Sequence, residues 1–169
     1  MNNCARLAKA AGVFEIPLIA TKQANFGAIV KQVKAEHKNS SVFEKKKFSM
    51  WIPEVEIKLR AMPNINTVVL YGIETQVCIY QTAMDLLEAK YRVVLVVDAI
   101  SSMEHFDRNV AIEALRDAGC QLITFQGLVF EYMRSFEYPK FKQVLQIVKG
   151  IPADSLDLHH FNSYGKPKL

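Results

Sequence analysis

The sequence lacks the motifs on which several common α/β chemistries depend. Its seven glycines form neither Gly-x-Gly-x-x-Gly nor a Walker loop, so neither dinucleotide nor P-loop binding is supported. Met84, rather than an arginine, stands six positions after Cys78, which excludes the phosphate loop of cysteine phosphatases. The Gly-x-Ser-x-Gly elbow of serine hydrolases is absent as well.

Cysteine and histidine are also scarce. The three cysteines, Cys4, Cys78 and Cys120, are odd in number and form no Cys-x-x-Cys pair. With no secretory signal visible, this favours free thiols in a reducing compartment, hence a cytoplasmic protein, with a mitochondrial one as the alternative. The four histidines form no cluster with metal-ligand spacing. We therefore expect no metal and no other cofactor.

Charge and hydrophobicity argue against two classes of partner. Lys plus Arg exceed Asp plus Glu by 21 to 17, a net charge of +4 that is spread along the chain apart from the lysines at 45–47. Such a mild excess is weak support for a nucleic-acid partner. The longest apolar runs are about six residues, too short to cross a membrane. We expect a small-molecule substrate, with no nucleic acid and no membrane.

The chain reads as one α/β domain. Its 169 residues are enough to bury a single core, and strand-like runs alternate with helical patterns, which predicts a doubly wound, mainly parallel sheet. An irregular C-terminal tail is expected at 151–169. Strands are expected at 16–20, 41–44, 67–71, 93–97 (closed by Asp98) and 121–125; helices are expected at 2–13, 25–36, 53–62, 76–89, 105–118 (with Val110, Ile112, Ala114 and Leu115 inward), 128–135 and 139–148.

The most informative segment runs from the strand at 67–71 into the helix that follows it. Gly72 allows a sharp turn, and Thr75 is a plausible N-cap for the helix. Cys78 then lies on the first helical turn, at the sheet edge where open α/β folds bind ligands. The free N–H groups and the helix dipole favour the thiolate there. The alternative is that Cys78 is a small core residue, which is common for a cysteine on an amphipathic helix.

Two motifs resemble those of a known family. The run Gly-Ile-Glu-Thr-x-x-Cys at 72–78, followed by Thr82 and Ala83, is similar to the nucleophile segment of the isochorismatase-like cysteine hydrolase superfamily. The run Lys-Lys-Lys-Phe-Ser-Met at 45–50 resembles that family's second motif, Lys-x-x-aromatic-Ser, which identifies Lys45 as the site lysine. With the Pro-x-Phe-Lys segment at 139–142, the resemblance is strongest to isochorismatase domain-containing proteins, and it runs from residue 2 to about 150.

The resemblance implies a site and a reaction. The fold would be a three-layer, Rossmann-type arrangement of six strands. Cys78 would attack the carbonyl of a small amide or imide, and Lys45 would stabilise charge. The backbone amides of Glu74 and Cys78 would form the oxyanion hole, with a cis peptide between Ile73 and Glu74. The family also favours a homo-oligomer.

The sequence departs from the family at its start. Family members open with a central strand ending in the aspartate that accepts the thiol proton, whereas the first aspartate here is Asp85. We therefore expect domain 1–150 to lack its first strand, with five of six strands remaining, as in a truncated family member. Hydrolase activity would then be impaired. The alternative function is a non-catalytic interaction or scaffold protein with the same fold. Whether the chain is an enzyme, its substrate and its oligomeric state stay open.

Two further departures narrow the reaction. Thr21, Lys22 and Gln23 stand where nicotinamidases carry metal-binding residues, which argues against that activity. Isochorismatase proper lacks the cysteine, so Cys78 argues against its reaction as well.

A missing first strand would lie between the strands at 16–20 and 67–71, and we expect an open gap or a weakly held N-terminal region there.

Overall fold

The computed structural model describes residues 2–29 and 40–150. The tail expected at 151–169 and most of the helix expected at 25–36 lie outside these ranges. The elements in chain order are α1 (Asn2–Phe14), β1 (Leu18–Gln23), β2 (Ser40–Lys45), α3 (Pro53–Arg60), β3 (Thr67–Ile73), the π-helical turn η1 (Thr75–Ile79), α4 (Tyr80–Glu88), β4 (Arg92–Ser101), α5 (His105–Asp117), β5 (Gln121–Ile123), α6 (Phe125–Met133) and α7 (Phe141–Lys149).

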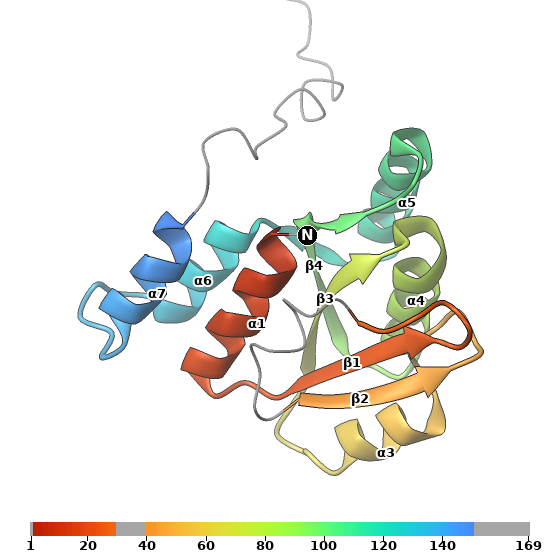
Figure 1. The fold of residues 1–169 in the computed structure, drawn as a ribbon, viewed down its shortest axis with the longest axis horizontal. Helices are drawn as coiled ribbons and strands as arrows, with labels where there is room; N and C mark the ends of the chain where they lie inside the picture. The colour runs from red at the N-terminus through yellow and green to blue at the C-terminus, as the bar shows by residue number, and fades with distance from the viewer. Residues whose placement is uncertain (1, 30–39, 151–169) are drawn as a thin grey trace, which may run out of the picture.

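The five strands form two parallel sheets rather than one. β1 pairs with β2 from Leu18↔Ser40 to Gln23↔Lys45. A second sheet has the order β3-β4-β5. Figure 1 shows the β1–β2 pair beside α3 at the base of the molecule, with β3 and β4 rising above it. The expectation of an α/β fold with parallel strands is confirmed. Among the described residues β1 and β3 do not pair with each other, which agrees with the gap expected between these two strands.

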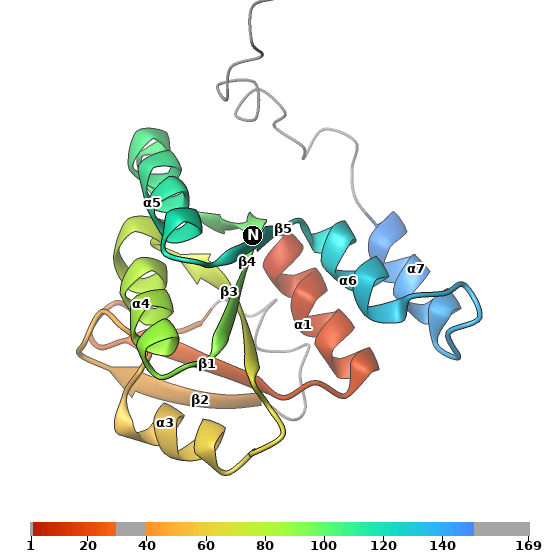
Figure 2. The same ribbon diagram turned by 180° about the vertical axis from the view of Figure 1, so that it is seen from behind.

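Helices cover both faces of the three-stranded sheet, which gives three layers. Along β4, Leu95 belongs to a core shared with α3, α4 and α5, while Val96 belongs to a core shared with α1, α6 and α7. Successive side chains of a strand point to opposite faces, so a strand buried on both sides needs a continuous apolar run. Figures 1 and 2 show α4 and α5 on one side of this sheet and α1, α6 and α7 on the other.

β3 ends in an irregular segment that leads to the nucleophile turn. The pairing of β3 with β4 is regular as far as Leu70↔Leu95 and then jumps to Gly72↔Ile100. Gly72 has φ = +132°, a conformation that other residues rarely adopt. The next peptide bond, between Ile73 and Glu74, is cis, in agreement with what the family resemblance implies.

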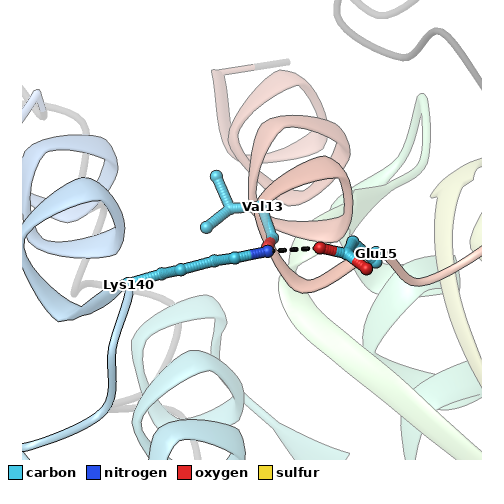
Figure 3. A network of polar contacts seen from close by, with 3 residues as sticks. All are labelled: Val13, Glu15 and Lys140. Atoms are coloured by element: carbon cyan, nitrogen blue, oxygen red, sulfur yellow. Dashed lines mark hydrogen bonds and ion pairs between the residues drawn. The ribbon is translucent and has the colours of Figure 1, made fainter.

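A lysine ties the first helix to the last. Lys140, just before α7, donates hydrogen bonds to the Val13 carbonyl (2.8 Å) and to Glu15 (2.5 Å), as Figure 3 shows. The ammonium thus lies at the C-terminal end of α1, where the helix dipole favours a cation. The hydrogen bond and charge of Lys140 lower the pKa of Glu15, and the same contact raises the pKa of Lys140. The contacts of Lys140 therefore link the end of α1 to the start of α7.

Several element boundaries differ from the sequence-based expectations. β4 continues past Asp98 to Ser101, because Asp98 turns its carboxylate to the Phe125 amide (2.8 Å) instead of ending the strand. Val110 is 50% exposed and Ala114 is exposed, so neither faces the core as expected, while Ile112 and Leu115 do. The apolar stripe of α5 is therefore narrower than predicted.

No helix among residues 2–29 and 40–150 is long and apolar enough to cross a membrane.

Candidate active site

Three strand ends bring the predicted site residues together. Gln23 ends β1 and Lys45 ends β2, and the register of this parallel pair places them side by side. Cys78 lies on η1, directly after β3. The Nζ atom of Lys45 lies 2.6 Å from Oε1 of Gln23 and 3.6 Å from Sγ of Cys78. The carboxyl ends of β1, β2 and β3 thus meet at one point, although they belong to two sheets.

Lys45 is unusually buried for a lysine, with only 5% of its surface exposed. Besides Gln23 and Cys78, its ammonium contacts the carbonyls of Lys47 (3.0 Å) and Phe48 (2.7 Å) in the loop that follows it. These are neutral acceptors, which satisfy the ammonium protons without neutralising the charge. Burial of an ion without a counter-ion is costly.

The turn that carries Cys78 is wider than an ordinary α-helix. The Glu74 carbonyl accepts hydrogen bonds from the amides of Val77 (3.3 Å) and Ile79 (3.1 Å), but not from the amide of Cys78 between them. Such π-type turns are frequent at functional sites. The first amides of a helix have no carbonyl partner one turn earlier, so they are available to an anion. The Cys78 sulfur and this group of amides therefore share one helix start.

Thr75 does not cap this helix, contrary to the expectation from sequence. It is fully buried and its hydroxyl donates to the carbonyl of Ser101 on β4 (3.1 Å). Glu74 holds the N-cap position instead, without a side-chain cap. Its carboxylate accepts from the Met103 amide (3.0 Å) and from Gln76 (3.2 Å). The hydrogen bonds of Thr75 and Glu74 therefore attach the turn to the end of β4 and the residues after it.

A second set of contacts fastens the lysine loop to the nucleophile helix. Ser49 donates to Asp85 on α4 (2.6 Å), and the Met50 amide donates to the Thr82 hydroxyl (2.8 Å). Thr82 in turn donates to the carbonyl of Cys78 (2.6 Å). Ser49 and Thr82 stand at motif positions of the family, but no pattern in the sequence indicates their partners. Gln23 was missed as well, although a polar residue at the end of the strand beside Lys45 could have signalled it.

Two carboxylates close to Cys78 in the chain, Glu74 and Asp85, are held by other partners. In residues 2–29 and 40–150, no Asp or Glu forms an ion pair with Lys45, and Asp85 is engaged by Ser49. Asp98 lies on the far side of β4, bound to α6 and α1 through Phe125 and Asn3. Burial raises its pKa. A group able to accept the Cys78 proton is therefore not part of the described site.

The site opens into a cavity of about 730 Å³ between the two sheets. Both β1 and β3 line it over their whole length, and Lys45 and Cys78 stand at one end. Most of the lining is apolar, including Ile19 and Val68, and Glu131 is the one carboxylate among the lining residues that the structure describes. The same described ranges hold no cluster of His, Cys, Asp and Glu suited to a metal ion. The cavity therefore suits an apolar occupant.

Comparisons with known proteins agree with this geometry. The family model for the isochorismatase domain matches residues 1–127. Isochorismatase domain-containing protein 2 of Xenopus laevis is 39% identical over 153 residues, which cover 89% of this chain and 74% of that protein. The matched region thus includes both motifs.

Solved structures give the same assignment. The MAR1 ribonuclease of Caenorhabditis elegans is 36% identical with a TM-score of 0.85, covering 92% of this chain and 81% of that one. The YcaC gene product of Escherichia coli, described as an octameric hydrolase of unknown specificity, shares the fold at 23% identity with a TM-score of 0.73, covering 86% of this chain and 79% of that one. The chain belongs to the isochorismatase domain family.

Proposed function

We propose that this chain carries the nucleophile half of a cysteine hydrolase site for small amides or imides. The observation that carries the proposal is the 3.6 Å contact between the buried Lys45 ammonium and the Cys78 sulfur at the mouth of an apolar cavity. A cation at this distance stabilises a thiolate, which is the attacking form of cysteine. Family membership supports the same assignment, since both residues stand in its motifs.

The reaction would use the start of η1 as its electrostatic support. Cys78 attacks the substrate carbonyl, and the developing oxyanion is bound by the backbone amides of Glu74 and Cys78. Lys45 lies 3.6 Å from the sulfur and stabilises the negative charge that develops nearby during attack. These roles need no metal, and the thiol, the cation and the amides all belong to described residues.

A proton acceptor is the part that the described site does not supply. Loss of the carboxylate from a nucleophile–base system typically reduces kcat by about 10⁴-fold, and loss of the base itself by about 10⁶-fold. We therefore expect Cys78 to form an adduct with a reactive electrophile far more readily than it turns over an amide. If the thiol has ordinary reactivity, the chain is instead a non-catalytic interaction protein with this fold, and family resemblance favours a homo-oligomer for either function.

Alkylation of Cys78 by iodoacetamide tests the proposal directly. The rate is measured from pH 5 to 10 by mass spectrometry of the intact chain, with Cys4 and Cys120 replaced by serine so that a single thiol is followed. A poised thiol keeps most of its maximal rate at pH 7, whereas an ordinary thiol gains most of its rate above pH 8. The Lys45→Met variant is expected to shift the profile to the ordinary form. The exposed Lys46→Met variant, one position along, is the matched control and should leave it unchanged.

Cleavage of RNA is a separate outcome to examine, because the name of the C. elegans neighbour includes ribonuclease. Of the three consecutive lysines only Lys46 and Lys47 are exposed, since Lys45 is buried against Cys78. Two exposed lysines provide little attraction for a phosphate backbone. RNA cleavage that survives Cys78→Ser but is lost in the Lys46→Met/Lys47→Met double variant would refute the cysteine hydrolase assignment.

A further inference from the structure

The end of β4 and the loop after it are hydrogen-bonded to the nucleophile turn at three successive positions. Regular pairing of β3 with β4 stops at the last residue of each strand. Beyond that pair, the Ser101 carbonyl accepts from the Thr75 hydroxyl (3.1 Å), and the Ser102 hydroxyl accepts from the Thr75 amide (3.3 Å). The Met103 amide donates to the Glu74 carboxylate (3.0 Å). Side chains thus extend the contact between the two segments past the end of the strand ladder.

Gln76 closes these contacts into a ring. The Ser102 hydroxyl donates to Oε1 of Gln76 (2.7 Å), and Nε2 of Gln76 donates to Oε2 of Glu74 (3.2 Å). The same carboxylate oxygen accepts from the amide of Met103, which follows Ser102 in the chain. The Met103 side chain is 84% exposed, so this residue contributes its backbone to the ring. We call this set of contacts the Ser102–Gln76–Glu74 ring.

We propose that Ser102, Gln76 and the carboxylate of Glu74 are positioning residues that hold the Glu74 amide where it can bind the oxyanion. The inference rests on the hydrolase site proposed above, in which the amides of Glu74 and Cys78 are the two oxyanion donors. Such donors are effective because they are fixed in place before the charge develops. The ring holds Glu74 through its side chain and the next residue through its amide.

The two oxyanion donors are attached to the protein at different places. Cys78 is held through its carbonyl by Thr82, which also accepts from the Met50 amide in the lysine loop. Glu74 is held through the ring to the loop after β4. A break in the ring should therefore loosen the Glu74 amide while it leaves the contact between the Cys78 sulfur and the Lys45 ammonium in place.

The order of donors and acceptors shows why these residue types are needed. A glutamine side chain offers an acceptor oxygen and a donor nitrogen, so it can stand between a hydroxyl and a carboxylate. The Ser102 hydroxyl binds the oxygen of Gln76, which leaves the nitrogen of Gln76 facing Glu74. Hydrogen bonds to an ionised acceptor are stronger than those between neutral groups. The ring therefore keeps the Glu74 side chain in one position.

Two reagents separate positioning of the oxyanion donors from damage to the thiol. Iodoacetamide alkylates the thiolate at a methylene carbon and develops no oxyanion. With para-nitrophenyl acetate, the sulfur–carbon bond forms, the carbon–oxygen bond breaks, and para-nitrophenolate leaves without taking a proton. Its tetrahedral intermediate carries the oxyanion. The ratio of the acetylation rate to the alkylation rate at one pH therefore reports on the oxyanion donors and cancels the thiolate fraction.

The parent for the test is the single-thiol chain with Cys4→Ser and Cys120→Ser, and the same chain with Cys78→Ala gives the background acetylation of other groups. The parent ratio should exceed that of N-acetylcysteine by at least about tenfold. Ser102→Ala should lower the ratio by about tenfold, less than the outright loss of a donor, while alkylation stays within about twofold. Ser102→Thr keeps the hydroxyl and should keep the ratio. Ser135→Ala is the matched control, because its hydroxyl also accepts from a backbone amide but lies between α6 and α7.

A second variant cuts the ring at its next link. Gln76→Met removes both the acceptor of the Ser102 hydroxyl and the donor to Glu74, so it should lower the ratio as far as Ser102→Ala does. The double variant should lower the ratio no further, because both residues act through one ring. If Ser102→Ala fails to fold, Gln76→Met decides the question.

Several results would overturn the proposal. An equal fall of both rates would make the ring a part of the general scaffold, and an unchanged ratio would show that the Glu74 amide needs no such support. Additive losses in the double variant would mean that the two residues act separately. A parent ratio equal to that of N-acetylcysteine would remove the oxyanion site and the ring's role together. An ordinary pH profile of alkylation with a high parent ratio would instead refute the poised thiol alone.

Discussion

The hydroxyl of Thr82 is one of two side-chain groups on α4 that join the lysine loop to the nucleophile helix, and it also contacts the Cys78 carbonyl, so its removal tests how the site is built. Thr82→Val keeps the branched shape but removes the acceptor of the Met50 amide and the donor to the Cys78 carbonyl. Leaving the partly buried Met50 amide without a partner costs up to about 1–3 kcal/mol. For a chain of this size each kcal/mol lowers Tm by about 2–4 °C. We expect Tm to fall by about 2–12 °C.

The same change should act on the thiol. Met50 ends the loop whose carbonyls hold the Lys45 ammonium, and Thr82 bonds to Cys78 itself. When both ends are released, the contact between Nζ and Sγ loosens. We expect alkylation of Cys78 at pH 7 to slow by about tenfold, equivalent to about 1.4 kcal/mol. Calorimetry measures the change in Tm, and timed iodoacetamide labelling measures the rate of Cys78 alkylation.

Two comparisons make the result decisive. Thr67→Val removes a hydroxyl that contacts only its neighbour Asn66 at the surface, and should change stability by less than about 0.5 kcal/mol. In a Lys45→Met background, Thr82→Val should slow alkylation no further, because Thr82 acts through Lys45. An unchanged Tm, or an equal loss of rate with and without the lysine, would refute the reasoning.

Further predictions concern the scaffold. Gly119→Ala (φ = +104°, open space around the added carbon) should destabilise the fold by about 1–2 kcal/mol through backbone strain, while Gly150→Ala (φ = −72°) should be neutral or slightly stabilising in the same urea titration. Lys140→Met should lower Tm at neutral pH. Because the pKa of Glu15 is lowered in the fold, the difference from wild type should persist above about pH 5 and shrink as acid protonates Glu15, leaving the part that comes from the hydrogen bond to Val13. A constant difference down to pH 2 would contradict this. Burial raises the pKa of Cys120 to about 11, so stability should fall as pH rises above about 9 in wild type but not in Cys120→Ala.

The sequence predicted the fold class well because the signals were local. Every residue of the run at 93–97 is apolar, as expected for a strand buried on both faces. The run forms the centre of β4. Pro53 begins α3 as its fixed φ predicts. Motif spacing similarly placed Lys45 and Cys78 at strand ends that meet. Patterns of this kind depend on residues close in sequence, so they can be recognised whatever the order of the strands in the sheet.

The features that the sequence did not reveal depend on residues far apart in the chain. Thr75 has the right identity for an N-cap, but the Ser101 carbonyl, 26 residues away, takes its hydroxyl. Asp98 has the right identity to end a strand, but the Phe125 amide holds it within β4. Tertiary contacts determine which of several possible hydrogen-bond partners a polar side chain takes, so the roles of Thr75 and Asp98 could not be assigned from sequence alone.

The separation of the strands into two sheets has a consequence for how the chain folds and unfolds. Each sheet is built from a continuous stretch of chain, residues 18–45 for one and 67–123 for the other. Hydrogen bonds within one sheet can therefore break without breaking those of the other, which is the condition for two cooperative units of different stability. The two-stranded unit has far less buried surface, and a pair of strands is marginal by itself. Partial unfolding should therefore begin in β1 and β2, and a protease added under native conditions should leave a resistant fragment that contains β3, β4 and β5.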